Sequence, residues 1–255
     1  MIDLWLRSGT VGIVLVPLVL LNLIAFGIVW LTHLSPARPF FATFVGVCGP
    51  FFAAVSILFG LFSAFLANDV HSQNAAINAA ISKEADGIRT MLRIAEALGP
   101  AGDPIEAAAV TYTRAVLEKE WPAKERWGSE AEDLGALRSL SVAILTPSLS
   151  AALPAAAHEV ILESLVEVRQ ARRERLDLVA GERDHMNWVA MVILGVLTQV
   201  AVAVVHLDKM RPQAMALAVF TAAFAATAIL IGLAERPDKE LNDSPLRVAL
   251  ATAAG

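Results

Sequence analysis

The stretch from Phe40 to Ala67 contains no charged side chain, and it constrains the fold more than any other feature of the chain. In a helix, at about 1.5 Å per residue, this stretch is longer than the roughly 30 Å hydrocarbon core of a bilayer. We therefore expect it to form a membrane-spanning helix. Its only cysteine is Cys48, the single cysteine of the chain, so no intrachain disulfide is possible.

Three further uncharged apolar runs are also long enough to cross a bilayer, at about 11–31, 188–205 and 214–234. The first of them is longer than the apolar core of a secretory signal, so we expect it to be retained as a span. The connections within each pair of spans are short, which predicts two antiparallel hairpins. With 56% hydrophobic residues, above the roughly 45–50% of soluble domains, the chain is predicted to be a multi-pass membrane protein.

Between the second and third spans the composition changes, and charged residues recur every few positions. The absence of strand-like alternation predicts a helical insert, so the expected fold is all-α. The predicted organisation is a first transmembrane hairpin at 1–69, a helical domain at 70–184, a second hairpin at 185–236 and a polar tail at 237–255. Lys and Arg near the span ends fall mostly on the side of the insert. The positive-inside rule therefore places the insert and both termini in the cytoplasm.

Small residues recur along the second span at alternating spacings of three and four, which places them on one helix face. This small-residue seam comprises Gly46, Gly49, Ala53, Ser56, Gly60, Ser63 and Ala67. Such seams are typical of helix packing faces in membranes, because small side chains let two backbones approach closely. A pore wall is the alternative interpretation. The polar residues that follow, beginning with Asn68 and Asp69, fit either the mouth of a conduit or an ordinary membrane boundary.

Known catalytic signatures are missing from the sequence. It contains no phosphate-binding glycine loop and no HExxH, GxSxG or CxxC motif, so we expect neither an enzyme nor a cofactor. Asp69 and His71 are two positions apart and point to different sides of a helix, which argues against a metal site. Glu118 and Glu120 are interpreted as a solvated helix end rather than an acid/base pair. The formal net charge of −5, without a basic cluster, argues against nucleic acid as a partner.

Four arginines, at positions 169, 172, 173 and 175, are interleaved with acidic residues in the last part of the insert. This pattern favours a solvated, ion-paired helix face. Contact with anionic lipid headgroups is the alternative, because the third span begins about ten residues later.

Four short segments resemble the bestrophin-like family of bacterial four-span membrane proteins. They are GLFSAFLANDV at 60–70, YTRAVLEKEWP at 112–122, ARRERL at 171–176 and ERP at 235–237. Their order and their spacing relative to the spans carry the resemblance. Bestrophins are ring-shaped ion channels, commonly pentameric, whose second spans line an apolar neck. The resemblance thus implies a homo-oligomeric channel for small monovalent ions, located in the bacterial inner membrane.

Along the bestrophin neck helix, the resemblance places Ala53, Ile57 and Leu61 at the positions that form the neck. Where bestrophins have a basic, tryptophan-rich exit, this chain has Asn68 and Asp69, which we expect at the cytoplasmic mouth of the pore. A ring of Asp69 carboxylates favours cations. Ile57 and Leu61 form an apolar stripe that borders the small-residue seam. If the seam packs against a neighbouring subunit, this stripe can face a central axis and form a constriction.

The sequence alone also allows a second function, of a different class. The chain is also compatible with a membrane-anchored scaffold or signalling protein that does not conduct. Its cytoplasmic helices then bind a partner, and its spans only anchor and oligomerise.

Overall fold

The computed structural model describes residues 5–6, 8–46, 49–121, 135–146, 153–180, 186–235 and 242–252. This described part is helical and contains no strand, as predicted. It divides into two compact units. The first comprises residues 1–72 and 183–239, and the second comprises residues 73–182 and 240–255.

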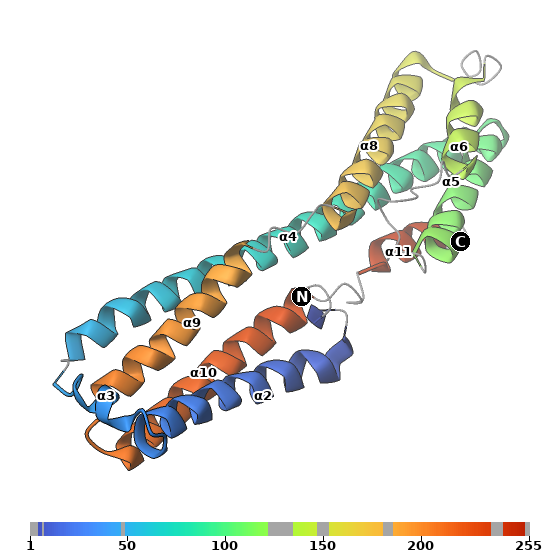
Figure 1. The fold of residues 1–255 in the computed structure, drawn as a ribbon. Helices are drawn as coiled ribbons and strands as arrows, with labels where there is room; N and C mark the ends of the chain where they lie inside the picture. Colours follow the sequence, from blue (N-terminus) through green and yellow to red (C-terminus); the bar gives the residue numbers. More distant parts are fainter. Residues whose placement is uncertain are drawn as a thin grey trace. The chain divides into compact units, whose positions relative to one another are not determined.

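The first unit contains the membrane helices (Figure 1). They are α2 (Gly9–Val29), which continues as the π-helix η1 (Trp30–Leu34), the first part of α4 (Gly49–Leu98), α9 (Met186–Val205) and α10 (Met210–Glu235). All four are long and apolar enough to cross a membrane, which confirms the four predicted spans. The protein is therefore a multi-pass membrane protein.

The membrane helices pack through aromatic side chains and through close contacts at glycines. Phe59 of α4 lies edge-on against Phe220 and Phe224 of α10, with ring centroids 5.4 and 5.0 Å apart. At Gly195 of α9, an added Cβ atom would lie only 2.2 Å from the ring of Phe224. A glycine at this position lets α9 approach α10 closely, the kind of contact that replaces the hydrophobic effect within a bilayer.

The start of the second span differs from the prediction. A short helix, α3 (Arg38–Ala42), is followed by a turn over residues 43–46, and α4 begins only at Gly49. Gly46 ends this turn with a φ angle of +107°, a left-handed conformation that favours glycine. Phe40 to Ala67 is thus not one continuous helix. Cys48 lies outside the described residues, as do Pro122, Arg236 and Pro237 of the family-like segments.

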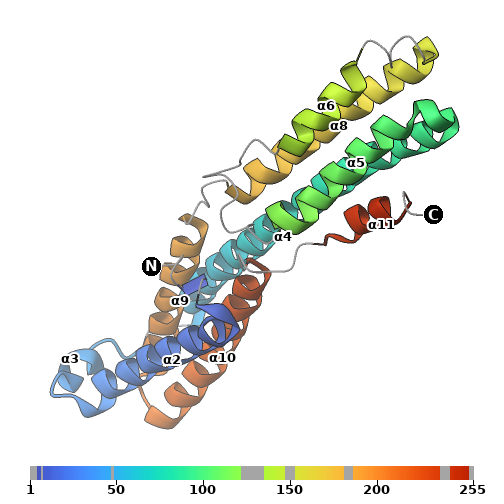
Figure 2. The ribbon, with the colours of Figure 1, turned by 90° about the vertical axis from the view of Figure 1, so that its right-hand side faces the viewer.

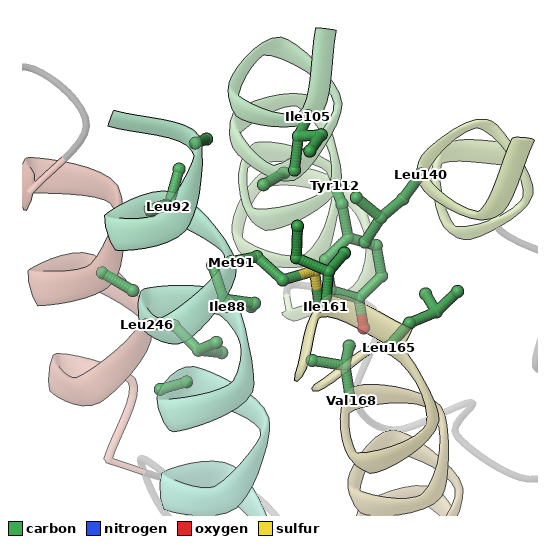
Figure 3. Close-up of a cluster of buried hydrophobic side chains, with 14 of the residues drawn as sticks. Ile88, Met91, Leu92, Ile105, Tyr112, Leu140, Ile161, Leu165, Val168 and Leu246 are labelled. Carbon is green, nitrogen blue, oxygen red and sulfur yellow. The ribbon is translucent and has the colours of Figure 1, made fainter. Parts of the chain in front are cut away.

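The second unit is a helical domain built around the remainder of α4 (Figure 2). Its other helices are η2 (Gly99–Ala101), α5 (Asp103–Ala115), the π-helix η3 (Val116–Glu120), α6 (Gly135–Leu145), α8 (Ala155–Ala180) and α11 (Ser244–Thr252). Figure 3 shows how their buried side chains meet, with Met91, Tyr112 and Ile161 coming from three different helices. Helix α4 itself is unbroken from its apolar first part into this domain.

The expected polar tail is in part a core element. Leu246 and Ala249 of α11 are fully buried and belong to the hydrophobic core of the helical domain. Figure 3 shows Leu246 facing α4 beside Ile88 and Leu92. The amphipathic pattern of α11 is only nine residues long, which made it hard to distinguish from a solvated tail.

Candidate functional site

The outward face of α4 carries the predicted neck residues. Ala53, Ile57 and Leu61 are all exposed, and Ile57 retains 69% of its accessible surface. The opposite face packs within the unit through Phe59, Leu66 and, at 8% exposure, Ser63. The neck residues therefore point away from the other membrane helices of the same chain.

Both predicted mouth residues are exposed as well, but they differ in direction. Asn68 follows Leu61 by seven positions, which is close to two full helical turns, so the two residues share one face of α4. Asp69 is turned by about 100° from Asn68 around the helix axis. Asn68 is thus in line with the neck residues, and Asp69 flanks that line.

The predicted small-residue seam follows one face of α4 from Gly49 to Ala67, but this face lies at the boundary between buried and exposed surface. Gly46 precedes α4, Gly49 is the first residue of α4, and Ser56 is half-buried. Ser63 faces the interior of its own chain, and its hydroxyl has no hydrogen-bond partner among the described residues. Gly60 and Ala67 are exposed, and an added Cβ atom at Gly60 meets no atom within 4 Å. Within a single chain, Gly60 and Ala67 are therefore accessible to a neighbouring helix.

A buried ion-pair cluster forms in the helical domain. Its centre is Arg175 of α8, whose side chain is fully buried together with that of Glu84 of α4. The Arg175 Nε donates to Glu84 Oε2 over 2.8 Å. Its Nη2 donates to Glu84 Oε1 over 3.3 Å and to Glu120 Oε1 over 2.5 Å. One guanidinium therefore connects α4, η3 and α8.

Three further side chains complete the cluster. Arg172 pairs with the second carboxylate oxygen of Glu120, with its Nη2 at 2.8 Å. The hydroxyl of Tyr112, also fully buried, donates to Glu84 Oε1 over 2.6 Å. Trp121 stacks on Arg175, whose guanidinium carbon is 5.4 Å from the ring centroid. Among the described residues, two arginines thus pair with two glutamates in this cluster.

Burial and charge shift two pKa values in this cluster. Burial raises the pKa of Tyr112 well above its usual value, and the nearby Glu84 carboxylate adds to the increase. For Arg175, burial lowers the pKa, but the carboxylates of Glu84 and Glu120 raise it by more than burial lowers it, so the pKa of Arg175 increases overall. Both groups are fixed in one protonation state, so the cluster is suited to holding helices together rather than to proton transfer.

Two sequence interpretations are corrected by this cluster. Glu120 is not part of a solvated helix end, because its side chain is only 8% exposed and is paired with two arginines. The arginines of α8 do not form a single solvated face either, because Arg175 is buried. Glu84 was missed altogether. The available signal was its position among the apolar residues Ile81 and Ile88, where a charge requires a buried partner.

The sequence and the fold of the chain are similar to those of known proteins. A family model described as the Bestrophin-like domain matches residues 19–238. Two crystal structures of variants of a bacterial bestrophin homolog from Klebsiella pneumoniae match with TM-scores of 0.70 and 0.65, each at 14% identity. The first alignment covers 97% of this chain and 96% of the other, and the second covers 93% and 94%.

A crystal structure described only as a membrane protein matches with a TM-score of 0.62 at 13% identity, covering 96% of each chain. No curated protein matches the chain. At such low identity the structural matches establish a shared fold, whereas the family model extends over most of the sequence, from within the first span to beyond the fourth. The chain belongs to the bestrophin-like family.

Proposed function

We propose that this protein is a homo-oligomeric ion channel whose α4 helices surround an axial path for small monovalent ions. The observation that carries the proposal is the outward face of α4. There, Ala53, Ile57 and Leu61 are exposed within a single chain and lead in line to Asn68. Membership of the bestrophin-like family supports it, since bestrophins are ion channels.

The neck residues have the chemistry of a hydrophobic gate. Ile57 and Leu61 repeated around an axis make successive apolar rings, and such a constriction controls conduction by excluding or admitting water. A single copy of α4 cannot enclose a path, so several chains must be related by a rotational axis. The pentamer implied by the resemblance to bestrophins is our proposed assembly.

Exposed Gly60 and Ala67 border the neck face and are proposed as part of the contact between neighbouring subunits. Small side chains at this position allow the α4 helices of two subunits to approach closely. The excess of Lys and Arg on the side of the helical insert supports a cytoplasmic location for this domain and for both termini, with the spans in the bacterial inner membrane.

The channel proposal is tested by electrical recording together with charge changes at the mouth. Purified wild-type protein in planar bilayers is expected to carry a current. Under a salt gradient, Asn68→Lys is expected to move the reversal potential toward anion selectivity, because it adds a ring of positive charge in line with the neck. Asp69→Lys is expected to shift it in the same direction by removing a ring of negative charge and adding a positive one.

Two outcomes contradict the proposal at different levels. Absence of any wild-type current, from protein that remains oligomeric, refutes conduction and favours the non-conducting scaffold. A measurable current whose reversal potential is unchanged in both lysine variants removes residues 68 and 69 from the mouth. A larger shift for Asn68→Lys supports the more axial direction of that residue.

The subunit contact is tested by Gly60→Leu. Within one chain the new side chain has open space, so the fold and helix propensity of α4 are expected to be unharmed. If a neighbouring copy packs against Gly60, the leucine overpacks that contact and the oligomer is expected to dissociate. Native electrophoresis or light scattering of the purified protein measures the change.

Gly27→Leu is the matched control, because Gly27 on α2 is likewise surrounded by open space. It is expected to leave the oligomer intact. Equal behaviour of the two variants shows that Gly60 has no special part in assembly.

A further inference from the structure

The four arginines of the last insert helix divide into two pairs with different surroundings. Arg172 and Arg175 are bound to the carboxylates of the buried ion-pair cluster. Arg169 and Arg173 are exposed on another face of α8. In the described part of the chain, neither Arg169 nor Arg173 forms a hydrogen bond or an ion pair. The buried pair therefore has a structural role, while the exposed pair has no role in holding this unit together.

The exposed pair lines an open hollow of about 900 Å³ on the helical domain. Its polar lining consists of Lys83 from α4 and, from α8, Arg169, Gln170, Arg173, Glu174 and Asp177. Val166 and Leu178 add apolar surface at positions on either side of this polar set. These α8 residues recur at spacings of three and four, so they share one face of the helix.

The charges in this hollow favour an anion at the arginines. The lining has three basic side chains against two acidic ones, Glu174 and Asp177, which leaves an excess of positive charge. Glu174 lies 3.8 Å from the amine of Lys83, so this acid is matched by a lysine rather than by an arginine. Arg169 and Arg173 lie one helical turn apart, where like charges repel each other and destabilise a helix. A multivalent anion between them reverses this repulsion, and the amide of Gln170 supplies a further donor beside them.

Guanidinium groups bind phosphate through paired hydrogen bonds, because their planar donors match the phosphate oxygens. We propose that this hollow is a binding site for a phosphate group, held by Arg169 and Arg173 with Lys83 at its edge. The phosphate can come from an anionic lipid headgroup or from a soluble compound. The sequence position of the site fits a lipid source, because the third span begins at Met186, only nine positions after Asp177. The site does not depend on ion conduction.

The test uses the purified full-length protein in detergent and two titrants. One is inorganic phosphate and the other is a short-chain phosphatidylglycerol, with short-chain phosphatidylcholine as the zwitterionic comparison. Isothermal titration of the wild type is expected to show one site per chain for at least one anionic titrant. The affinity of Arg169→Gln/Arg173→Gln is expected to fall at least about tenfold, since two charge-assisted contacts are lost.

Arg93→Gln/Arg138→Gln is the matched control. It removes the same charge from exposed positions of the same domain but outside the hollow, and it is expected to bind as the wild type does. Binding of inorganic phosphate identifies a soluble source, and binding of phosphatidylglycerol alone identifies a lipid source. No binding by the wild type, or equal losses in the two double variants, overturns the proposal. Equal thermal unfolding midpoints of both variants exclude a folding defect.

Discussion

Glu84→Ala is expected to destabilise the helical domain by about 3–5 kcal/mol, because it leaves the fully buried Arg175 without its main counter-charge. The same substitution removes the acceptor of the buried Tyr112 hydroxyl. Thermal unfolding of the purified protein, followed by circular dichroism and by limited proteolysis within residues 73–182, measures the loss. We expect a large decrease in the unfolding midpoint and early cleavage in this region.

Lys83→Ala is the matched control for this experiment. Lys83 is the preceding residue of α4 and also pairs with α8, through Glu174, but the two side chains are 57% and 44% exposed. Such a solvated pair contributes at most about 1 kcal/mol. If Glu84→Ala unfolds no earlier than Lys83→Ala, the buried cluster does not hold α4 and α8 together.

The double variant Ile57→Ala/Leu61→Ala is expected to carry a several-fold larger current than the wild type at the same voltage. Truncating both side chains widens the proposed neck and makes it less apolar, so water and ions enter more readily. Both residues are exposed within the single chain, so their truncation leaves no cavity in the packed core of that chain. Single-channel recording in planar bilayers measures the effect.

Leu58→Ala is the corresponding control. Leu58 is similar in size and 46% exposed, but the helical period turns it about 100° away from Ile57. Its current is expected to match that of the wild type. An equal increase in this control, or an unchanged current in the double variant, removes Ile57 and Leu61 from the conduction path.

Hydropathy was sufficient to predict the four spans, because length and absence of charge are local properties of the sequence, and the absence of strand-like alternation was sufficient to predict a helical insert. It failed where an apolar stretch contains a turn. The run from Phe40 to Ala67 is uncharged throughout, yet the chain turns at residues 43–46 and begins α4 at Gly49. The signals for this break were Gly46 and the Gly49–Pro50 pair, since glycine permits a left-handed turn and proline favours the first positions of a helix.

The buried ion-pair cluster could not be predicted from the spacing of charges along one helix. Alternating charges on α8 fit an exposed face, and only the packing of α4, η3 and α8 shows that Arg175 meets Glu84 and Glu120. The approximate place of the candidate pore was predicted through the resemblance to a family. The direction of each side chain required the helix itself, which separates Asn68 from Asp69 and places Ser63 inside the chain.

The burial of Leu246 and Ala249 has a consequence for the order in which the protein matures. The core of the helical domain joins residues 73–182 to residues 240–255, and α9 and α10 are synthesised between these two segments. The ribosome must therefore deliver the second pair of membrane helices before the domain can acquire its last core residues. Domains generally fold as units during synthesis, but this one completes its folding only after insertion of the spans has begun.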